Sequence, residues 1–340
     1  MTDFIDKNSV HVPVLLKEVI NFLSPDPNGI YVDGTLGGGG HTEAIVRKIQ
    51  ENPKNNQPTI TIEKSGMIIA MDRDIAAINQ TEKQLRKIFN NKNEKPNNNS
   101  NNISDDTFDK KFPVRFAHAN YRYVDEVLDL LQIDKIDGFL LDLGLSSDQL
   151  IDNNRGFSFD SAGLLDLRFD TSEGETAYEL LERLKENEIA DIIYQFGEER
   201  YSRRIARAIA ERRKMGQPVR TARELAELVR SRVPRERRTT KEHSVNFDPA
   251  TRTFQALRIA VNDELDSLKS VLKIVPNRLK PNGVMAVISF HSLEDRIVKN
   301  AFRDNSCWEI ITKKPVTPSE EEIKRNPRAR SAKLRAAKKR

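Results

Sequence analysis

Three aspartates in this sequence follow short apolar runs of the kind that form buried strands. They are Asp33, Asp72 and Asp142. In an open parallel sheet, the carboxyl ends of the strands lie at one edge, and ligands bind in the crevice there. The positions of the three carboxylates therefore predict a ligand site at that edge.

Four consecutive glycines follow the first aspartate in Tyr31-Val-Asp-Gly-Thr-Leu-Gly-Gly-Gly-Gly-His41. Glycines between a strand and a helix let the backbone approach a ligand and offer it free N–H groups. A dinucleotide-type Gly-x-Gly-x-x-Gly pattern that starts at Gly37 places Thr42 at the third glycine, so the match is imperfect. A carboxylate at Asp33 favours a cationic ligand, such as the sulfonium and amino group of S-adenosylmethionine, over a diphosphate. A purely structural glycine turn is the alternative.

The second aspartate lies in Ala70-Met-Asp-Arg-Asp74. An acidic residue at the end of a second strand is placed to accept hydrogen bonds from both ribose hydroxyls of a nucleotide cofactor. We assign this role to Asp72 and expect Asp74 to cap the next helix. Nicotinamide cofactors and S-adenosylmethionine both contain an adenosine ribose, so this feature does not distinguish them.

The third aspartate ends Ile136-Asp-Gly-Phe-Leu-Leu-Asp142 and precedes Ser146, Ser147 and Gln149. Methylation of an exocyclic amine needs an acceptor near the nitrogen, because its lone pair is delocalised into the ring and a proton must leave. Asp142 is therefore the candidate catalytic residue. The alternative is that Asp142 only caps a helix.

The elements that position these residues alternate between strand and helix. Strand-like runs are expected at 30–33, 67–71, 114–117, 136–141, 284–290 and 308–312, and helices at 42–50, 75–89 and 124–131. This rhythm predicts an α/β fold, a doubly wound parallel sheet with helices on both faces. Residues 1–150 and 246–312 are expected to form this domain, with one long helix over Ala250–Leu279.

The rhythm breaks between residues 151 and 245, where the pattern is helical and amphipathic, which predicts an inserted helical domain. Two segments are expected to be unstructured. The first is the Asn-rich loop 90–110, which has too little apolar surface to order itself. The second is the basic C-terminal tail, residues 313–340.

The 340 residues are 37% hydrophobic and carry a formal net charge of +5. The first ten residues lack an apolar signal core, and no run is long enough to span a membrane. The single cysteine excludes an internal disulfide and fits a reducing compartment, and the scattered histidines do not suggest a metal site. These features predict a cytoplasmic protein without a membrane or metal partner.

The basic residues are grouped. Residues 324–340 hold nine Lys or Arg and no acid, and one face of a predicted helix carries Arg200, Arg203, Arg204 and Arg207. Charge in blocks favours a polyanionic partner such as RNA. A solvated helix face with a solubilising tail is the alternative.

Several longer motifs carry a resemblance to one family. Besides the glycine turn, they are His11-Val-Pro-Val-Leu-Leu-Lys-Glu18, Gly138-Phe-Leu-Leu-Asp-Leu-Gly-Leu-Ser-Ser147, Arg155-Gly-Phe-Ser-Phe159, Gly197-Glu-Glu-Arg-Tyr201, Ala250-Thr-Arg-Thr-Phe-Gln-Ala256, Ile288-Ser-Phe-His-Ser-Leu-Glu-Asp-Arg-Ile297 and Asn326-Pro-Arg-Ala-Arg-Ser331. In this order, from about His11 to Arg335, the sequence resembles the ribosomal RNA small subunit methyltransferase H family, also called MraW.

The resemblance implies a Rossmann-like class I methyltransferase fold. It further implies methyl transfer from S-adenosylmethionine to N4 of a cytosine in the decoding region, the P site, of 16S ribosomal RNA. The family's cofactor positions fall here on Gly39, Gly40, His41, Asp72, Tyr121, Asp142 and Gln149. The family commonly has Phe at the position of Tyr121, and either residue supplies an aromatic wall for adenine.

One motif of many amino-methyltransferases, Asp/Asn-Pro-Pro-aromatic, is replaced here by Asp142-Leu-Gly-Leu. The identity of the proton acceptor therefore stays open. Ser146, Ser147 and a cluster of His291, Glu294 and Asp295 are further candidates for it.

Three other functions fit parts of this pattern. A nicotinamide-dependent oxidoreductase is disfavoured by the missing third glycine and by Asp33. A non-enzymatic ribosome-binding factor with a vestigial pocket would not need the full set of site residues. A small-molecule methyltransferase would leave the arginine-rich helix unexplained. The sequence leaves open whether the chain forms a homodimer and whether free 16S rRNA or the small ribosomal subunit is its substrate.

Overall fold

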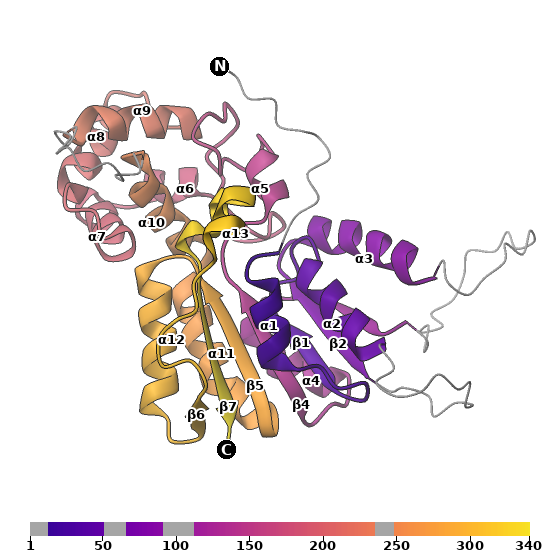
Figure 1. Ribbon diagram of the computed structural model, residues 1–340. Coiled ribbons are helices and arrows are strands. Elements are labelled where there is room, and N and C mark those ends of the chain that lie inside the picture. Colours follow the sequence, from indigo (N-terminus) through magenta and orange to yellow (C-terminus); the bar gives the residue numbers. More distant parts are fainter. Residues whose placement is uncertain (1–12, 51–65, 91–111, 235–247) are drawn as a thin grey trace, which may run out of the picture. The chain divides into compact units, whose positions relative to one another are not determined.

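The computed structural model describes residues 13–50, 66–90, 112–234 and 248–340, and the chain divides into two compact units (Figure 1). The first unit comprises Met1–Gly144 and Ser267–Arg340, and the second comprises Leu145–Asp266. The expected domain boundary at residue 246 differs from this division, because the helix Ala250–Asn262 belongs to the second unit. The Asn-rich segment 90–110, apart from Asn90, lies outside the described residues.

The first unit is built on a sheet that contains seven strands within the described residues, in the order β3-β2-β1-β4-β5-β7-β6. The strands are β1 (Ile30–Asp33), β2 (Met67–Asp72), β3 (Val114–His118), β4 (Ile136–Asp142), β5 (Leu279–Ser289), β6 (Trp308–Ile310) and β7 (Lys333–Lys339). Strands β1 to β5 pair in parallel, and β7 runs antiparallel between β5 and β6. The predicted doubly wound α/β sheet is confirmed.

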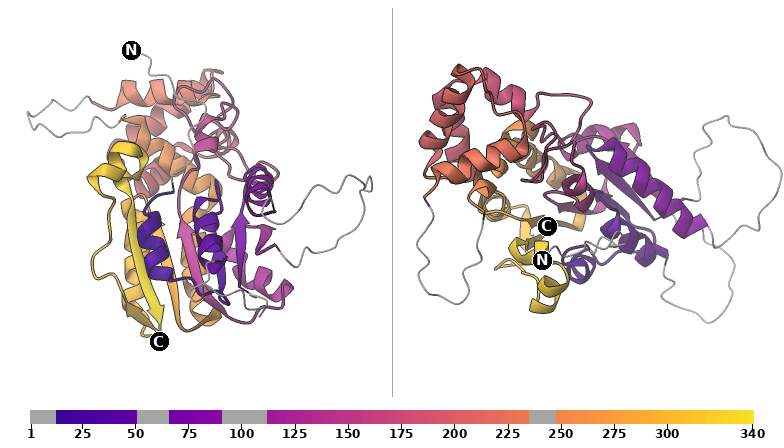
Figure 2. Two further views of the ribbon diagram at one scale, coloured as in Figure 1. Left: turned by 45° about the vertical axis from the view of Figure 1, so that its right-hand side comes forward. Right: turned by 90° about the horizontal axis from the view of Figure 1, so that it is seen from above.

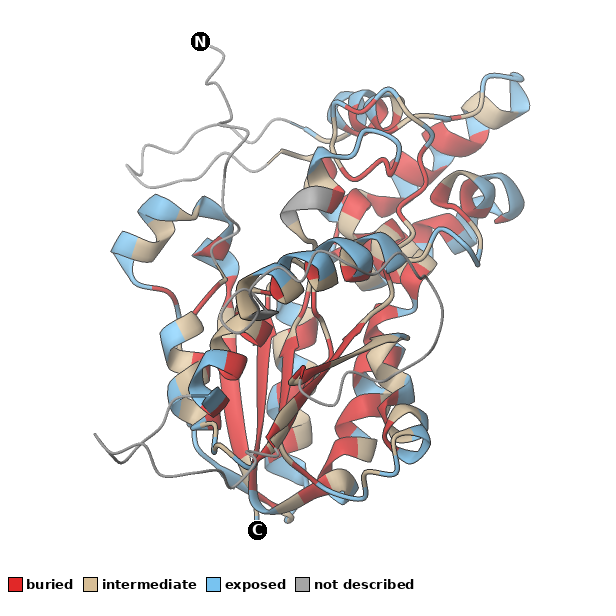
Figure 3. Cartoon of the chain, turned by 90° about the vertical axis from the view of Figure 1, so that its right-hand side faces the viewer, coloured by how far each residue is buried: buried red, intermediate tan, exposed pale blue. Residues whose placement is uncertain are grey.

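Helices cover both faces of this sheet (Figure 2). One face packs against α1 (Leu16–Leu23), α2 (Gly40–Gln50) and α3 (Ile75–Asn90), and the other packs against α4 (Val124–Leu130), α11 (Glu264–Arg278) and α12 (Ser292–Asp304). Successive strand residues alternate between the two cores: Ile68 and Ala70 face one, and Ile69 and Met71 face the other. Both faces are therefore buried, which explains why β1, β2 and β4 consist mainly of apolar residues (Figure 3).

The strand order reverses between β1 and β4, which are neighbours although they are not consecutive in the chain. At such a switch point the connections leave in opposite directions and open a crevice at the carboxyl edge. Asp33 and Asp142 end the two strands that flank this point.

The expectation of an unstructured C-terminal tail is wrong. The tail contains α13 (Glu320–Arg325), a 3-10 helix η2 (Pro327–Ser331) and β7, whose Leu334, Ala336 and Ala337 are fully buried. Its basic composition suggested a solvated segment, but Arg335 donates from Nε to Asp295 Oδ1 at 2.6 Å. This ion pair offsets the cost of burying the guanidinium group, and the small side chains of β7 then fit between β5 and β6.

The expected long helix over Ala250–Leu279 is also wrong. It is divided into α10 (Ala250–Asn262) and α11 by Asp263, which adopts a left-handed conformation with φ of 50°. A residue in this conformation ends a helix.

The second unit is helical. Its elements are α5 (Ser147–Ile151), α6 (Ala177–Arg183), α7 (Glu186–Gly197), α8 (Ser202–Lys214), α9 (Ala222–Arg232), α10 and the first residues of α11. Helices α7 and α10 pack closely at Gly197, where a Cβ would lie 2.5 Å from the carbonyl oxygen of Arg252. Buried Asn262 donates from Nδ2 to the carbonyl oxygen of Leu167 at 2.7 Å and fixes the loop before α6 to this core.

Candidate active site

The glycine turn between β1 and α2 has a backbone that other residues would not adopt. Gly37 and Gly39 have φ of 47° and 75°, and a Cβ on Gly39 would lie 2.3 Å from Thr81 Cγ2. The hydroxyl of Thr81 donates to the carbonyl oxygen of Gly37 at 2.8 Å. The turn is thus held against α3, and Gly40 begins α2 directly after it.

Asp72 connects the end of β2 to this turn. Its Oδ2 accepts a hydrogen bond from the Gly37 N–H at 2.8 Å, and its Oδ1 accepts one from the Asp74 N–H at 2.9 Å. Each carboxylate oxygen can accept a second bond, so Asp72 keeps acceptor capacity for a ligand. Burial raises its pKa. Asp74 accepts from the Ala76 N–H at 3.1 Å, which confirms its expected role as the cap of α3.

Asp33, only 1% exposed, lies at the end of β1. Its Oδ2 accepts from the Thr42 hydroxyl at 2.7 Å, and its Oδ1 accepts from the Thr35 N–H at 3.1 Å. Burial, with a smaller contribution from the charge of Asp72, raises its pKa to about 6. Thr42, which broke the dinucleotide glycine pattern, is therefore the residue that holds the Asp33 carboxylate.

Asp142 ends β4, beside β1. Its backbone N–H donates to the Thr35 hydroxyl at 2.6 Å, and its Oδ1 is buried without a hydrogen-bond partner. Burial raises its pKa well above the ordinary value, and the charges of Asp33 and Glu294 add to this effect. A buried acceptor without a donor is costly, so this carboxyl group favours a proton or a cationic ligand.

His41 connects Asp142 to the N-terminal part of the chain. Its Nε2 lies 3.0 Å from the carbonyl oxygen of Val14, and its Nδ1 lies 3.6 Å from Asp142 Oδ2. A carbonyl oxygen only accepts, so Nε2 carries the hydrogen and Nδ1 is the nitrogen that faces the carboxyl group. This contact of the His41 side chain was not foreseen, because the sequence does not show which side chains meet across the sheet edge.

Tyr121 lies in a 3-10 helix, η1 (Tyr121–Tyr123), directly after β3. A Cβ on Gly34 would lie 3.0 Å from Tyr121 Cβ, so the glycine allows the tyrosine to approach the end of β1. The structure therefore brings together at one sheet edge Asp33, Gly39, Gly40, His41, Asp72, Tyr121 and Asp142.

The other candidate acceptors are engaged in local structure. Asp295 pairs with Arg335. Glu294 accepts from the Phe290 N–H at 2.8 Å and, in a capping box, from the His291 N–H at 3.3 Å. In the second unit, Gln149 Oε1 accepts from the Ser146 N–H at 3.1 Å, and Ser146 Oγ accepts from the Gln149 N–H at 3.2 Å. The side chain of Ser147 lies outside the described part of the chain.

The four arginines Arg200, Arg203, Arg204 and Arg207 are exposed, at and within the N-terminal half of α8. Ile205 and Ile209, on the other side of this helix, are buried in the core of the second unit. Nε of Arg207 lies 3.8 Å from Oε1 of Glu186. The guanidinium group of Arg200 lies over the ring of Tyr201. The predicted amphipathic helix is confirmed.

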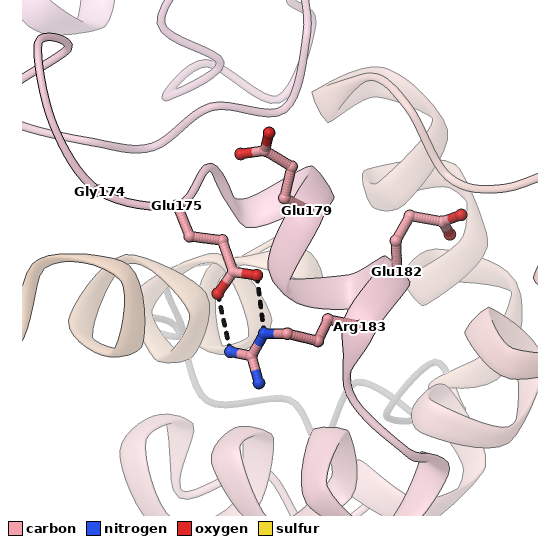
Figure 4. Close-up of a pocket in the computed structure, with 5 residues that line it drawn as sticks. All are labelled: Gly174, Glu175, Glu179, Glu182 and Arg183. Carbon is pink, nitrogen blue, oxygen red and sulfur yellow. Dashed lines mark hydrogen bonds and ion pairs between the residues drawn. The ribbon is translucent and has the colours of Figure 1, made fainter.

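A surface pocket of the second unit is lined by Gly174, Glu175, Glu179, Glu182 and Arg183 (Figure 4). Its arginine forms two hydrogen bonds with Glu175, at 2.8 and 2.9 Å. Three carboxylates against one paired cation repel phosphate, so this pocket does not suit a nucleic acid. It contains none of the residues that the sequence singled out.

Within the described residues, no three potential metal-ligating side chains lie together, and no helix has the length and apolar character to cross a membrane.

The switch-point crevice, the glycine turn held by Asp72, and the antiparallel strand beside β5 define a Rossmann-like methyltransferase. The model of the MraW methylase family matches residues 8–340, and the chain belongs to this family.

Relatives are similar over nearly the full length. The chain is 44% identical to the ribosomal RNA small subunit methyltransferase H of Sorangium cellulosum, over 96% of this chain and 90% of that protein. It is also 44% identical to the protein of the same name from Rhodopirellula baltica, over 96% of this chain and 91% of that one.

Among solved structures, an rRNA methylase from Streptococcus thermophilus is 8% identical with a TM-score of 0.41, over 96% of this chain and 98% of its own. A methyltransferase from Streptococcus mutans in complex with SAH is 10% identical with a TM-score of 0.40, over 97% of this chain and 99% of its own.

Proposed function

We propose that this chain transfers a methyl group from S-adenosylmethionine to the exocyclic N4 of a cytosine in the decoding region of 16S ribosomal RNA. The observation that carries the proposal is Asp142, a partly exposed carboxyl group whose Oδ1 is buried and unpaired, at the switch point beside the glycine turn. The name of the relatives, ribosomal RNA small subunit methyltransferase H, supports the substrate class. The choice of N4 and of the P site follows from the resemblance.

The residues present fit the cofactor. The backbone of Gly39 and Gly40 would contact its methionine part, Asp72 would accept from the ribose hydroxyls, and Tyr121 would cover one face of the adenine. Asp33 and Asp142 supply negative charge where the cofactor is cationic, and the unpaired Oδ1 of Asp142 needs a donor or a cation. The family resemblance also assigns Gln149, a residue of the second unit, to the cofactor. When bound, S-adenosylmethionine supplies an electrophilic methyl group.

Asp142 is the proposed proton acceptor. Transfer of the cofactor's methyl group to N4 would leave the sulfur with the electron pair of its bond to that carbon, and the nitrogen would have to lose one proton, which Asp142 would accept. A carboxylate with a raised pKa is a stronger base than an ordinary aspartate, which suits this step. His41, fixed by its Nε2–H to the Val14 carbonyl oxygen, places Nδ1 3.6 Å from Oδ2 of Asp142 and would limit the position of this carboxyl group by contact.

The RNA would bind through Arg200, Arg203, Arg204 and Arg207, whose exposed guanidinium groups can contact phosphates. We further propose that the small ribosomal subunit in the cytoplasm is the substrate. A homodimer is compatible with this function and is not required by it.

The test is methyl transfer from labelled S-adenosylmethionine to small subunits that lack the modification, followed by mass spectrometry of the nucleosides. Labelled N4-methylcytidine at one position is the expected product. Label on another nucleoside would refute the proposed target. Absence of transfer, together with thermal stabilisation by NAD alone, would favour the oxidoreductase, and absence of transfer with retained subunit binding would favour the non-enzymatic factor.

A further inference from the structure

The C-terminal residues 317–332 lie between Val316, which bridges to Leu334, and the start of β7. They leave the sheet and return to it, and we call them the C-terminal excursion. Its two ends are fixed to each other, because Val316 and Leu334 exchange backbone hydrogen bonds of 2.9 and 2.8 Å. It is fixed a second time by Glu322, whose Oε1 accepts from the Leu15 N–H at 2.7 Å. A sequence that reads as a solvated tail is therefore a structured element (Figure 1).

The excursion buries its small residues and exposes its basic ones. Ala329 and Ala332 are fully buried in the core beneath one face of the sheet. The exposed basic side chains are Lys324, Arg325, Arg328 and Arg330. Arg325 makes only a loose, exposed contact of 3.7 Å with Glu321, and Glu322 is engaged with Leu15. The anchored alanines thus hold Arg328 and Arg330 on the outer surface.

This basic surface lies at the same sheet edge as the candidate active site. Asp142 on β4 is level with Ile288 on β5, and Ile288 is level with Leu334 on β7. The three residues form one row across adjacent strands, so Leu334 lies two strand spacings, about 10 Å, from Asp142. The excursion directly precedes this point in the chain.

We propose that the C-terminal excursion binds phosphates of the RNA next to the methylated nucleotide, through Lys324, Arg325, Arg328 and Arg330. This inference rests on the proposed function. It adds a second RNA contact, on the first unit, which carries the candidate active site and is the methyltransferase unit. The excursion meets β7 at this edge, so its long, exposed basic side chains lie at the edge of the sheet where a base must reach Asp142. Because the excursion is already ordered, binding does not have to order a tail, and less affinity is lost to entropy.

The first alternative is that these charges only keep the protein in solution. That function does not require a fixed backbone, whereas this segment is fixed by buried alanines and by backbone hydrogen bonds. An acidic protein surface would also attract these cations. RNA is favoured because the basic side chains lie at the edge where the substrate base must enter.

The test compares two double variants. Lys324→Ala with Arg330→Ala removes two charges from the excursion. Lys299→Ala with Arg340→Ala is the matched control, because it removes two exposed basic side chains of the same unit that lie outside the excursion. Binding of deproteinised 16S rRNA is measured across a range of salt concentrations, cofactor affinity is measured by calorimetry, and methyl transfer to unmodified small subunits is measured in single turnover.

We expect the excursion variant to bind RNA about tenfold more weakly and to reduce the slope of log K against log salt by about 1.5, since each lost phosphate contact removes about 0.7–0.9. Cofactor affinity should match the wild type, and the control should keep the wild-type slope. An unchanged slope in the excursion variant would overturn the inference. So would a loss of activity on subunits with normal binding of deproteinised RNA, which would point to a ribosomal protein as the partner. A wild-type chain that transfers no methyl group would instead refute the proposed function.

Discussion

Replacement of Asp33 by Asn should make this protein more stable, and the gain should depend on pH. The carboxyl group has an ordinary pKa of 3.8 and a pKa of about 6 in the folded chain. Between these values the native state binds more protons than the unfolded state, so stability falls as the pH rises from about 4 to 6 and is then constant. The full cost of the charged group above pH 6 is about 3 kcal/mol.

Asparagine removes this cost without losing the local hydrogen bonds. Its oxygen can accept from the Thr35 N–H, and its amide can donate to the Thr42 hydroxyl. Two-state linkage then predicts a gain of about 2 kcal/mol at pH 5 and about 3 kcal/mol at pH 8. Asp134→Asn, at an exposed position, is the control and should change stability by less than about 0.5 kcal/mol at either pH.

Urea unfolding followed by tryptophan fluorescence measures this change in the correct unit, because Trp308 is the single tryptophan and is buried in the methyltransferase unit. The same variant should bind S-adenosylmethionine at least about tenfold more weakly, since a negative charge near the cationic cofactor is lost. If Asp33→Asn raised the free energy of unfolding equally at pH 5 and pH 8, or lowered it, the charged form of Asp33 would not be what destabilises the folded chain, and this reasoning would be refuted.

Three further predictions concern binding and rate. Asp72→Ala should weaken cofactor binding by about 2–3 kcal/mol, because two ribose hydroxyls lose a charged acceptor; an unchanged dissociation constant in calorimetry would remove Asp72 from the site. Asp142→Asn should lower the single-turnover rate at saturating cofactor by at least ~100-fold with RNA affinity retained, whereas a near-normal rate would leave Asp142 a binding or structural role. Replacement of Arg200, Arg203, Arg204 and Arg207 by Ala should leave cofactor affinity intact, weaken RNA binding and reduce its salt dependence; an unaltered salt slope would identify them as a solvated face.

The sequence alone was sufficient to predict the strands that carry the site and the aspartates at their carboxyl ends. Apolar runs that end in an aspartate predicted β1, β2 and β4 nearly to the residue, because strands buried on both faces leave a continuous apolar signal. The glycine turn and the cap at Asp74 were likewise readable, since both are set by residues close together in the chain.

Only the tertiary structure decided what depends on distant partners. The contact of His41 with Asp142 joins residues about a hundred positions apart, and the role of Thr42 appears only when its hydroxyl meets Asp33. The C-terminal strand was mistaken for a solvated tail because its local composition is basic. Burial of Arg335 becomes favourable only when Asp295, forty residues earlier, supplies the opposite charge, and no local pattern in the sequence contains that pairing.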